Sequence, residues 1–185
     1  MPERLGLLDG RDFAAVLFDM DGTLIDSIPV VLRSWLRWAD EEGVDPARLV
    51  GFHGVPARGI AEKLLPADRV DAAVDRIEAI ETADTEGITV LPGTLIALAT
   101  LSGSGRGGSD LCAIATSCTQ PLADARIAAT GLPVPRVVVT ASDVRQGKPR
   151  PDPFLLAAQR LGVDPRECLV VEDAPGGLEA ARAAG

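Results

Sequence analysis

The chain has 185 residues, and its 27 acidic against 18 basic side chains leave a formal net charge of −9. The length fits one domain carrying an insertion, and a content of 46% apolar and 24% charged residues excludes a disordered, collagen-like or low-complexity chain. The acidic balance, with only four Phe, two Trp and no Tyr for base stacking, argues against nucleic acid or an anionic membrane as a partner.

Short apolar runs alternate with helix-like segments along most of the chain. The predicted strands, apolar on both faces, cover residues 14–18, 111–115, 136–140 and 168–171. The predicted helices cover residues 94–101, 120–130, 152–161 and 175–184. This alternation predicts an α/β fold of Rossmann-like type, with a parallel sheet covered by helices on both faces.

Residues 27–89 interrupt the alternation, because they carry helix signals and no convincing strand. Pro29 and Pro56 begin two predicted helices, and a third starts near Ala67. We expect this segment, the helical insert, to form a small α-helical domain. The remaining residues, 1–26 and 90–185, are expected to form the main α/β unit.

The N-terminal sequence and the cysteines favour a cytoplasmic protein. The opening MPERLGLLDGRD contains acidic residues and no apolar stretch of signal length, and no segment approaches the roughly 18 consecutive apolar residues of a membrane span. Cys112, Cys118 and Cys168 form no Cys-x-x-Cys pair and have no His nearby, so we expect buried, reduced thiols and no zinc site.

Polar residues gather after the predicted strands, at the sheet edge where parallel α/β proteins bind ligands. They are Asp19 and Asp21 after the first strand, Thr116 and Ser117 after the second, Lys148 after the third, and Glu172 and Asp173 after the fourth. Each feature alone is ordinary, since Asp and Gly are common in turns and a surface Lys is usually solvated. Together, however, the acids repel one another unless a cation lies among them, and carboxylate oxygens suit Mg²⁺.

At these residues the chain resembles the haloacid-dehalogenase superfamily. The four motifs of that superfamily match DMDGT (19–23), ATS (115–117), GKPRPDPF (147–154) and VVEDAP (170–175). The helical insert after the first motif is similar to the superfamily's first type of cap. Within the superfamily, the segments that resemble sugar-phosphate and polyol-phosphate phosphatases are DSIPVVLRSW (26–35), HG (53–54) and TSCTQPLADAR (116–126).

The resemblance implies a role for each motif residue in a phosphatase acting on a small phosphorylated metabolite. Asp19 would be the nucleophile that forms an aspartyl phosphate, and Asp21 the general acid and base. Lys148 would offset negative charge, while Thr116 and the backbone amide of Ser117 would hold phosphoryl oxygens. The implied Mg²⁺ ligands are Asp19, the backbone carbonyl of Asp21, Asp173 and, directly or through water, Glu172.

Two alternatives stay open beside this phosphatase. A β-phosphoglucomutase-like phosphomutase would share the chemistry, but such relatives have a His where this chain has Val31. The other alternative is a truncated, non-catalytic member that binds a phosphate or a partner protein, because relatives continue after the fourth motif with further strands. Without them, the strand at 168–171 is expected at an uncovered sheet edge. Asp21, which dehalogenases lack, favours phosphate chemistry over carbon–halogen cleavage.

In the helical insert, His53 and Arg58 are the candidate substrate contacts. His53 is the only His of the chain, and in sugar-phosphatase relatives the HG pair is followed closely by an Arg. Each residue also has an ordinary explanation, because a lone His is more often structural and an Arg on a helix usually faces solvent. Trp35 and Trp38 lie three positions apart on a predicted helix, so we expect them in the core of the insert.

Overall fold

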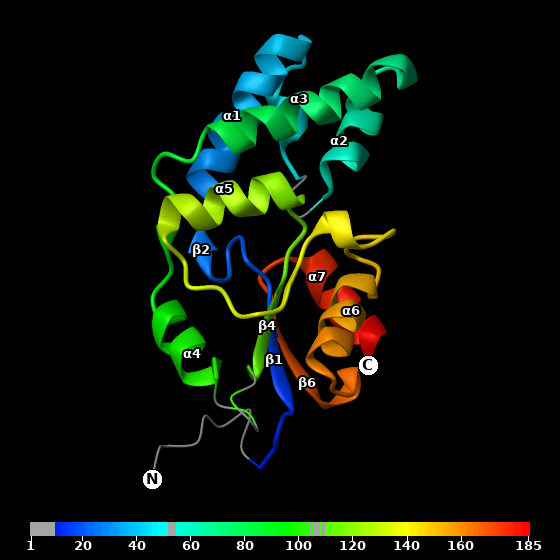
Figure 1. Cartoon of the computed structure of the whole chain (residues 1–185). Helices are drawn as coiled ribbons and strands as arrows, with labels where there is room; N and C mark the ends of the chain where they lie inside the picture. The colour runs from blue at the N-terminus through cyan, green and yellow to red at the C-terminus, as the bar shows by residue number, and fades with distance from the viewer. Residues whose placement is uncertain (1–9, 52–54, 104, 106–107, 109) are drawn as a thin grey trace.

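A computed structural model of the chain describes residues 10–51, 55–103, 105, 108 and 110–185 (Figure 1). The parallel sheet of this described part has the order β5-β4-β1-β6. Its strands are β1 (Ala15–Phe18), β4 (Cys112–Ala115), β5 (Val138–Val139) and β6 (Cys168–Val171). The predicted strands are therefore confirmed. The third is shorter than expected, because only Val138 and Val139 pair with β4.

Helices cover both faces of this sheet. They are α4 (Thr94–Leu101), α5 (Gln120–Thr130), α6 (Asp152–Leu161) and α7 (Pro175–Ala184), with the short 3-10 turns η4 (Ala141–Asp143) and η5 (Pro165–Glu167) before α6 and β6. Successive residues of β1 point to opposite faces, so Phe18 packs with α4 and α5, while Leu17 packs with α6 and α7. The predicted α/β architecture is thus confirmed.

A separate apolar cluster lies among the helices of the insert, which Figure 1 shows together at one end of the molecule. The elements are α1 (Ile28–Glu42), η1 (Pro46–Leu49), α2 (Ala57–Leu64), η2 (Ala67–Arg69) and α3 (Val70–Ala83). Trp38 is fully buried there, and its indole N–H donates a hydrogen bond of 2.8 Å to the carbonyl of Ala73. Trp35 packs edge-on against it with ring centroids 5.1 Å apart, which confirms the role expected for both tryptophans.

A small antiparallel ladder joins the two ends of the insert and corrects the expectation that this region contains no strand. It consists of β2 (Ile25–Asp26) and β3 (Thr89–Val90), with Ile25 opposite Val90. Strands of two residues are too short to show the alternating pattern by which a strand is recognised in a sequence. Because β2 directly precedes the insert and β3 spans its last residue, the ladder holds the entry and exit of the insert side by side.

Within the described residues β6 pairs with β1 and lies at an edge of the sheet, as expected. The cysteines are free, and Cys112 and Cys118 are buried, but Cys168 is only half-buried because it belongs to this edge strand. The expectation of buried thiols is therefore wrong for Cys168. In the part of the chain that the structure describes, no helix has the length and apolar character needed to cross a membrane.

Candidate active site

The register of the parallel strands brings the motif residues to one edge of the sheet. Phe18 of β1 pairs with Val171 of β6, so Asp19 and Glu172 are the next residues of two neighbouring strands. Thr116 leaves β4 at the same edge, directly after the last pairing with β5. This is the edge at which parallel α/β sheets bind their ligands.

Lys148 reaches this edge from the loop between η4 and α6 and joins two carboxylates. Its Nζ donates hydrogen bonds of 2.6 Å to Oδ1 of Asp19 and 2.6 Å to Oε2 of Glu172. All three side chains are buried, with 6%, 8% and 2% of the Lys148, Asp19 and Glu172 side chains exposed. The ammonium also lies 4.9 Å from the centre of the Phe154 ring, which favours a cation there.

The buried carboxylates outweigh the positive charge that Lys148 supplies. Burial raises the pKa of Asp19 from its ordinary value of 3.8 to about 7, the Lys148 ammonium lowers it in part, and Glu172 raises it again. Burial alone would lower the pKa of Lys148, but Asp19 and Glu172 raise it above its ordinary value. A further cation beside Asp19 would therefore favour its ionised form.

Asp19, Glu172 and Asp173 fit a hard divalent cation. Their carboxylate groups each offer an oxygen, and these oxygens lie within 4.8 Å of one another. A donor set made only of oxygen atoms is the kind that Mg²⁺ prefers. Gly22 lets the first-motif turn pass this close, because a Cβ there would lie 2.2 Å from Oδ2 of Asp173 and the residue has a φ of +84°.

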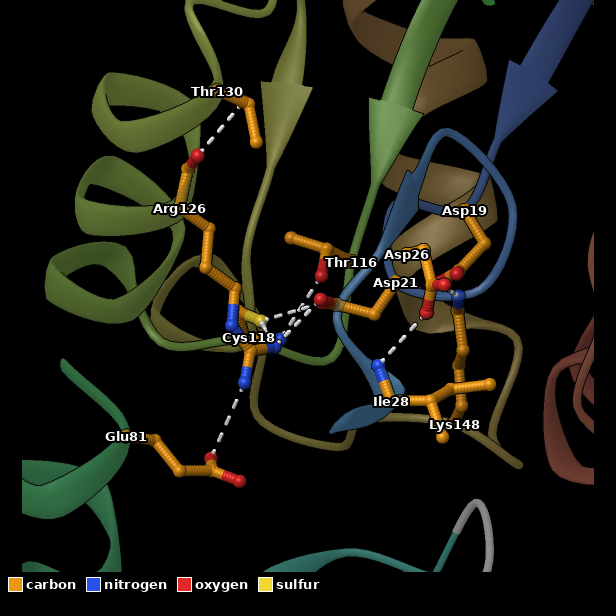
Figure 2. Close-up of polar contacts among 10 residues, drawn as sticks. All are labelled: Asp19, Asp21, Asp26, Ile28, Glu81, Thr116, Cys118, Arg126, Thr130 and Lys148. Atoms are coloured by element: carbon orange, nitrogen blue, oxygen red, sulfur yellow. Dashed lines mark hydrogen bonds and ion pairs between the residues drawn. The ribbon is translucent and has the colours of Figure 1, made fainter. Parts of the chain in front are cut away.

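Asp21 faces α5 instead of Lys148. Its Oδ1 lies 2.7 Å from Nη1 of Arg126, and the thiol of Cys118 donates to its Oδ2 at 3.0 Å. Arg126 in turn lies 3.6 Å from Oε2 of Glu81, a residue of α3 in the insert. Figure 2 shows the Asp21 carboxylate pointing toward Arg126 and Cys118, while the Asp19 carboxylate points toward Lys148.

Comparison with known proteins assigns the chain to a family. The family model for haloacid dehalogenase-like hydrolases matches residues 13–185. This chain belongs to that family. The resemblance seen in the motifs is therefore confirmed, and the chain is an enzyme of the hydrolase class.

Two curated relatives of this haloacid dehalogenase-like hydrolase come from Escherichia coli K12. Hexitol phosphatase A is 46% identical over 173 residues, which cover 91% of this chain and 78% of the relative. Fructose-1-phosphate phosphatase YqaB is 34% identical over 181 residues, which cover 94% of this chain and 93% of the relative. Among solved structures, a hydrolase from Pseudomonas syringae has a TM-score of 0.79 at 28% identity, over 93% of this chain and 81% of that one.

The other predicted site residues of this hydrolase are placed as follows. Thr116 is buried, with its hydroxyl accepting a hydrogen bond of 3.1 Å from a backbone amide of the next turn, whereas Ser117 is exposed. The Arg58 guanidinium pairs with Asp71 of α3 at 2.8 Å, so its ion pair lies within the insert and does not join the acidic cluster. His53 lies outside the described residues.

Arg126 ends the TSCTQPLADAR segment, but the sequence-based expectations give it no role, although its position carries a signal for one. It lies on the buried face of α5 together with Leu122 and Ala123. An arginine in an apolar helix face predicts a buried acidic partner, because an unpaired buried charge is very costly. Glu81 is the second such partner, and burial raises its pKa from 4.5 to about 7, with Arg126 lowering it in part.

Proposed function

We propose that this hydrolase is an Mg²⁺-dependent phosphatase that cleaves small sugar or polyol phosphates through an aspartyl phosphate on Asp19. The observation that carries the proposal is the buried Asp19 carboxylate, 2.6 Å from the Lys148 ammonium and grouped with Glu172 and Asp173 at the ligand-binding edge of the sheet. The substrate class rests on the relatives, which are named for a hexitol phosphate and for fructose 1-phosphate.

In the first step, an oxygen of the Asp19 carboxylate attacks phosphorus. The bond between phosphorus and the ester oxygen breaks, its electron pair stays on that oxygen, and the oxygen takes a proton from the Asp21 carboxyl group. The free alcohol leaves, and Asp19 carries the phosphoryl group. Lys148 offsets the charge on the phosphoryl oxygens, and Thr116 and the amide of Ser117 orient them.

In the second step, a water molecule attacks the same phosphorus atom from solvent. It gives a proton to the Asp21 carboxylate, which regenerates the acid used in the first step. The bond from phosphorus to Asp19 breaks and returns its electron pair to the carboxylate. The products are one alcohol and one inorganic phosphate, and the chain returns to its starting state.

Four groups of this chain would hold the metal ion: the carboxylates of Asp19 and Asp173, the backbone carbonyl of Asp21, and Glu172 directly or through water. The bound cation supplies positive charge that offsets the repulsion between an anionic nucleophile and an anionic phosphate ester. Glu172 also holds Lys148 in place. Its Oε2 accepts a hydrogen bond from Lys148, and its Oε1 accepts one of 3.1 Å from the backbone amide of Ala174.

We also propose that residues 27–89 act as a cap that selects the leaving group. Its helix α3 packs against α5, whose N-terminus directly follows the second motif. Closure of such an element over a site excludes water and shapes the space left for the alcohol. His53 and Arg58 remain candidate contacts of the cap with the sugar or polyol.

Phosphate release from a panel of sugar and polyol phosphates, with and without Mg²⁺, tests the proposal. We expect release from the wild type only with Mg²⁺, and none above background from Asp19→Asn. The matched control is Asp164→Asn, which alters an exposed carboxylate paired with Arg166 and should keep full activity. Equal release from wild type and Asp19→Asn would contradict the proposal, as would an isomerised sugar phosphate formed faster than free phosphate.

A further inference from the structure

A buried charge network connects the helical insert to the first motif. Arg126 of α5 lies between Asp21 of the first-motif turn and Glu81 of α3, at 2.7 Å and 3.6 Å. The side chains of Arg126, Asp21 and Glu81 are 4%, 23% and 13% exposed. One guanidinium therefore meets carboxylates from two parts of the chain that are far apart in sequence.

Packing alone does not account for an arginine at this position. Removing a guanidinium from water costs several kcal/mol, and apolar side chains that replace a buried charge together with its partners often fill the space with no loss of stability. Within the described part of the chain, Nε and Nη2 of Arg126 are buried and make no hydrogen bond. The side chain is thus kept although, among the described residues, its Nε has no hydrogen-bond partner and its Nη2 has only the 3.6 Å ion pair with Glu81, which points to a use for its charge and direction.

The geometry suits Arg126 to hold the Asp21 carboxylate in position. The guanidinium is planar and rigid, so the attraction of Glu81 to Nη2 at 3.6 Å on one side favours one direction for Nη1, which meets Asp21 on the other. Cys118 adds to this arrangement, because it accepts from Nη1 at 3.1 Å and donates to Asp21 at 3.0 Å. A second contact, in which the Thr119 hydroxyl donates to Glu78, joins α3 to the N-terminal end of α5.

We propose that Arg126 is the positioning residue for the general acid and base Asp21, and that Glu81 makes this position depend on the seating of the insert against α5. The inference rests on the proposed function, in which Asp21 protonates the departing alcohol. Arg126 touches neither the nucleophile Asp19 nor the acidic cluster in the described contacts, and it acts through Asp21. Movement of α3 away from α5 would remove one of its two carboxylates and disturb the other.

The test uses leaving groups that differ in their need for a proton. An alkoxide leaves poorly unless it is protonated, whereas p-nitrophenolate leaves without help. We therefore compare kcat/KM for p-nitrophenyl phosphate with kcat/KM for the best alkyl phosphate of the panel, because kcat/KM reports the steps up to departure of the leaving group. We expect Arg126→Met to lose about 10- to 100-fold more on the alkyl phosphate than on the aryl phosphate, as for a misplaced catalytic group.

Further variants separate positioning from folding. Arg126→Lys keeps a charge, and Glu81→Gln keeps the shape of its side chain, so both should show the same split at a smaller size. Arg76→Met is the control, because Arg76 pairs with Glu41 inside the insert and is 41% exposed. Its ratio of the two kcat/KM values should stay within about twofold of wild type, since exposed ion pairs contribute little.

Equal losses on both substrates in Arg126→Lys and Glu81→Gln would overturn the inference, even if Arg126→Met failed to fold. The same two kcat/KM values measured for Asp21→Asn show whether the inference about Arg126 or the proposed function has failed. If Asp21→Asn shows the split and the Arg126 variants do not, only the inference about Arg126 is wrong. If Asp21→Asn shows no split, the acid role of Asp21 is wrong and the inference falls with it.

Discussion

Replacing Gly22 with alanine should separate the stability of the first-motif turn from its ability to bind metal. Gly22 has a φ of +84°, and an added Cβ would lie 2.2 Å from Oδ2 and 2.7 Å from Cγ of Asp173. Alanine in this backbone conformation costs about 1 to 2 kcal/mol. The contact also requires the Asp173 carboxylate to move by roughly 1 Å to reach an ordinary carbon–oxygen separation.

The second effect falls on the acidic cluster. Asp173 is exposed at the edge of the site, and the added Cβ would meet the far end of its side chain, so the clash is relieved by movement of the carboxylate and not of the backbone. The carboxylate that turns aside, however, no longer lies with Asp19 and Glu172. We expect the Mg²⁺ concentration for half-maximal activity to rise about 10- to 100-fold, the range seen when groups that orient metal ligands are removed.

Gly93→Ala provides the matched control. Gly93 has a φ of +88°, and no atom lies within 4 Å of its added Cβ. Urea unfolding should show similar losses of stability in both variants, whereas Mg²⁺ titrations of activity should shift only for Gly22→Ala. An unchanged Mg²⁺ dependence in Gly22→Ala, or an equal shift in Gly93→Ala, would refute the reasoning that Asp173 belongs to the metal site.

Three further outcomes follow from buried polar groups. Lys148→Met should lower kcat by about 10²- to 10³-fold in phosphate-release assays, because the developing charge loses its ammonium; a loss below tenfold would count against that role. Trp38→Phe removes the indole hydrogen bond to the carbonyl of Ala73 and part of a fully buried side chain, so it should cost about 1 to 3 kcal/mol in urea unfolding. An unchanged urea midpoint would contradict this packing and hydrogen bond. Burial raises the pKa of Glu81 from 4.5 to about 7, so the folded state keeps a proton that the unfolded state releases and stability falls as pH rises through this window. Urea midpoints of Glu81→Gln should therefore fall less between about pH 5 and 7 than those of the wild type, and parallel curves would contradict the shift.

Much of the fold follows from local sequence patterns. Helices α4, α5, α6 and α7 begin and end at the predicted residues, because apolar spacing, prolines near the first turns and the glycines after α5 and α6 are all local signals. The carboxyl edge of the sheet also follows from the order of the strands, which is why Asp19, Lys148 and Glu172 meet as expected. The β2–β3 ladder does not follow, since two-residue strands carry no pattern.

The contacts of Asp21 could not be predicted from local sequence patterns. Its contact with Cys118 spans 97 positions in the sequence, and its contact with Arg126 depends on how α5 packs against the first-motif turn. The apolar face of α5 shows that Arg126 is buried but does not say which carboxylate it meets. The nearby acids include Glu78 and Glu81, and only the packing of α3 on α5 decides between them.

Chemical trapping of the phosphoryl group tests the central claim most directly. Borohydride reduces an acyl phosphate to an alcohol, so a phosphorylated Asp19 becomes homoserine, which peptide mass spectrometry detects. Asp21→Asn, incubated with p-nitrophenyl phosphate and Mg²⁺ and then reduced, should carry homoserine at position 19, because p-nitrophenolate leaves without a proton while the attacking water lacks its base. A sample without substrate should not carry it. If the wild type releases phosphate but the reduced variant has no homoserine at position 19, or has the reduced group at another residue, the account is contradicted.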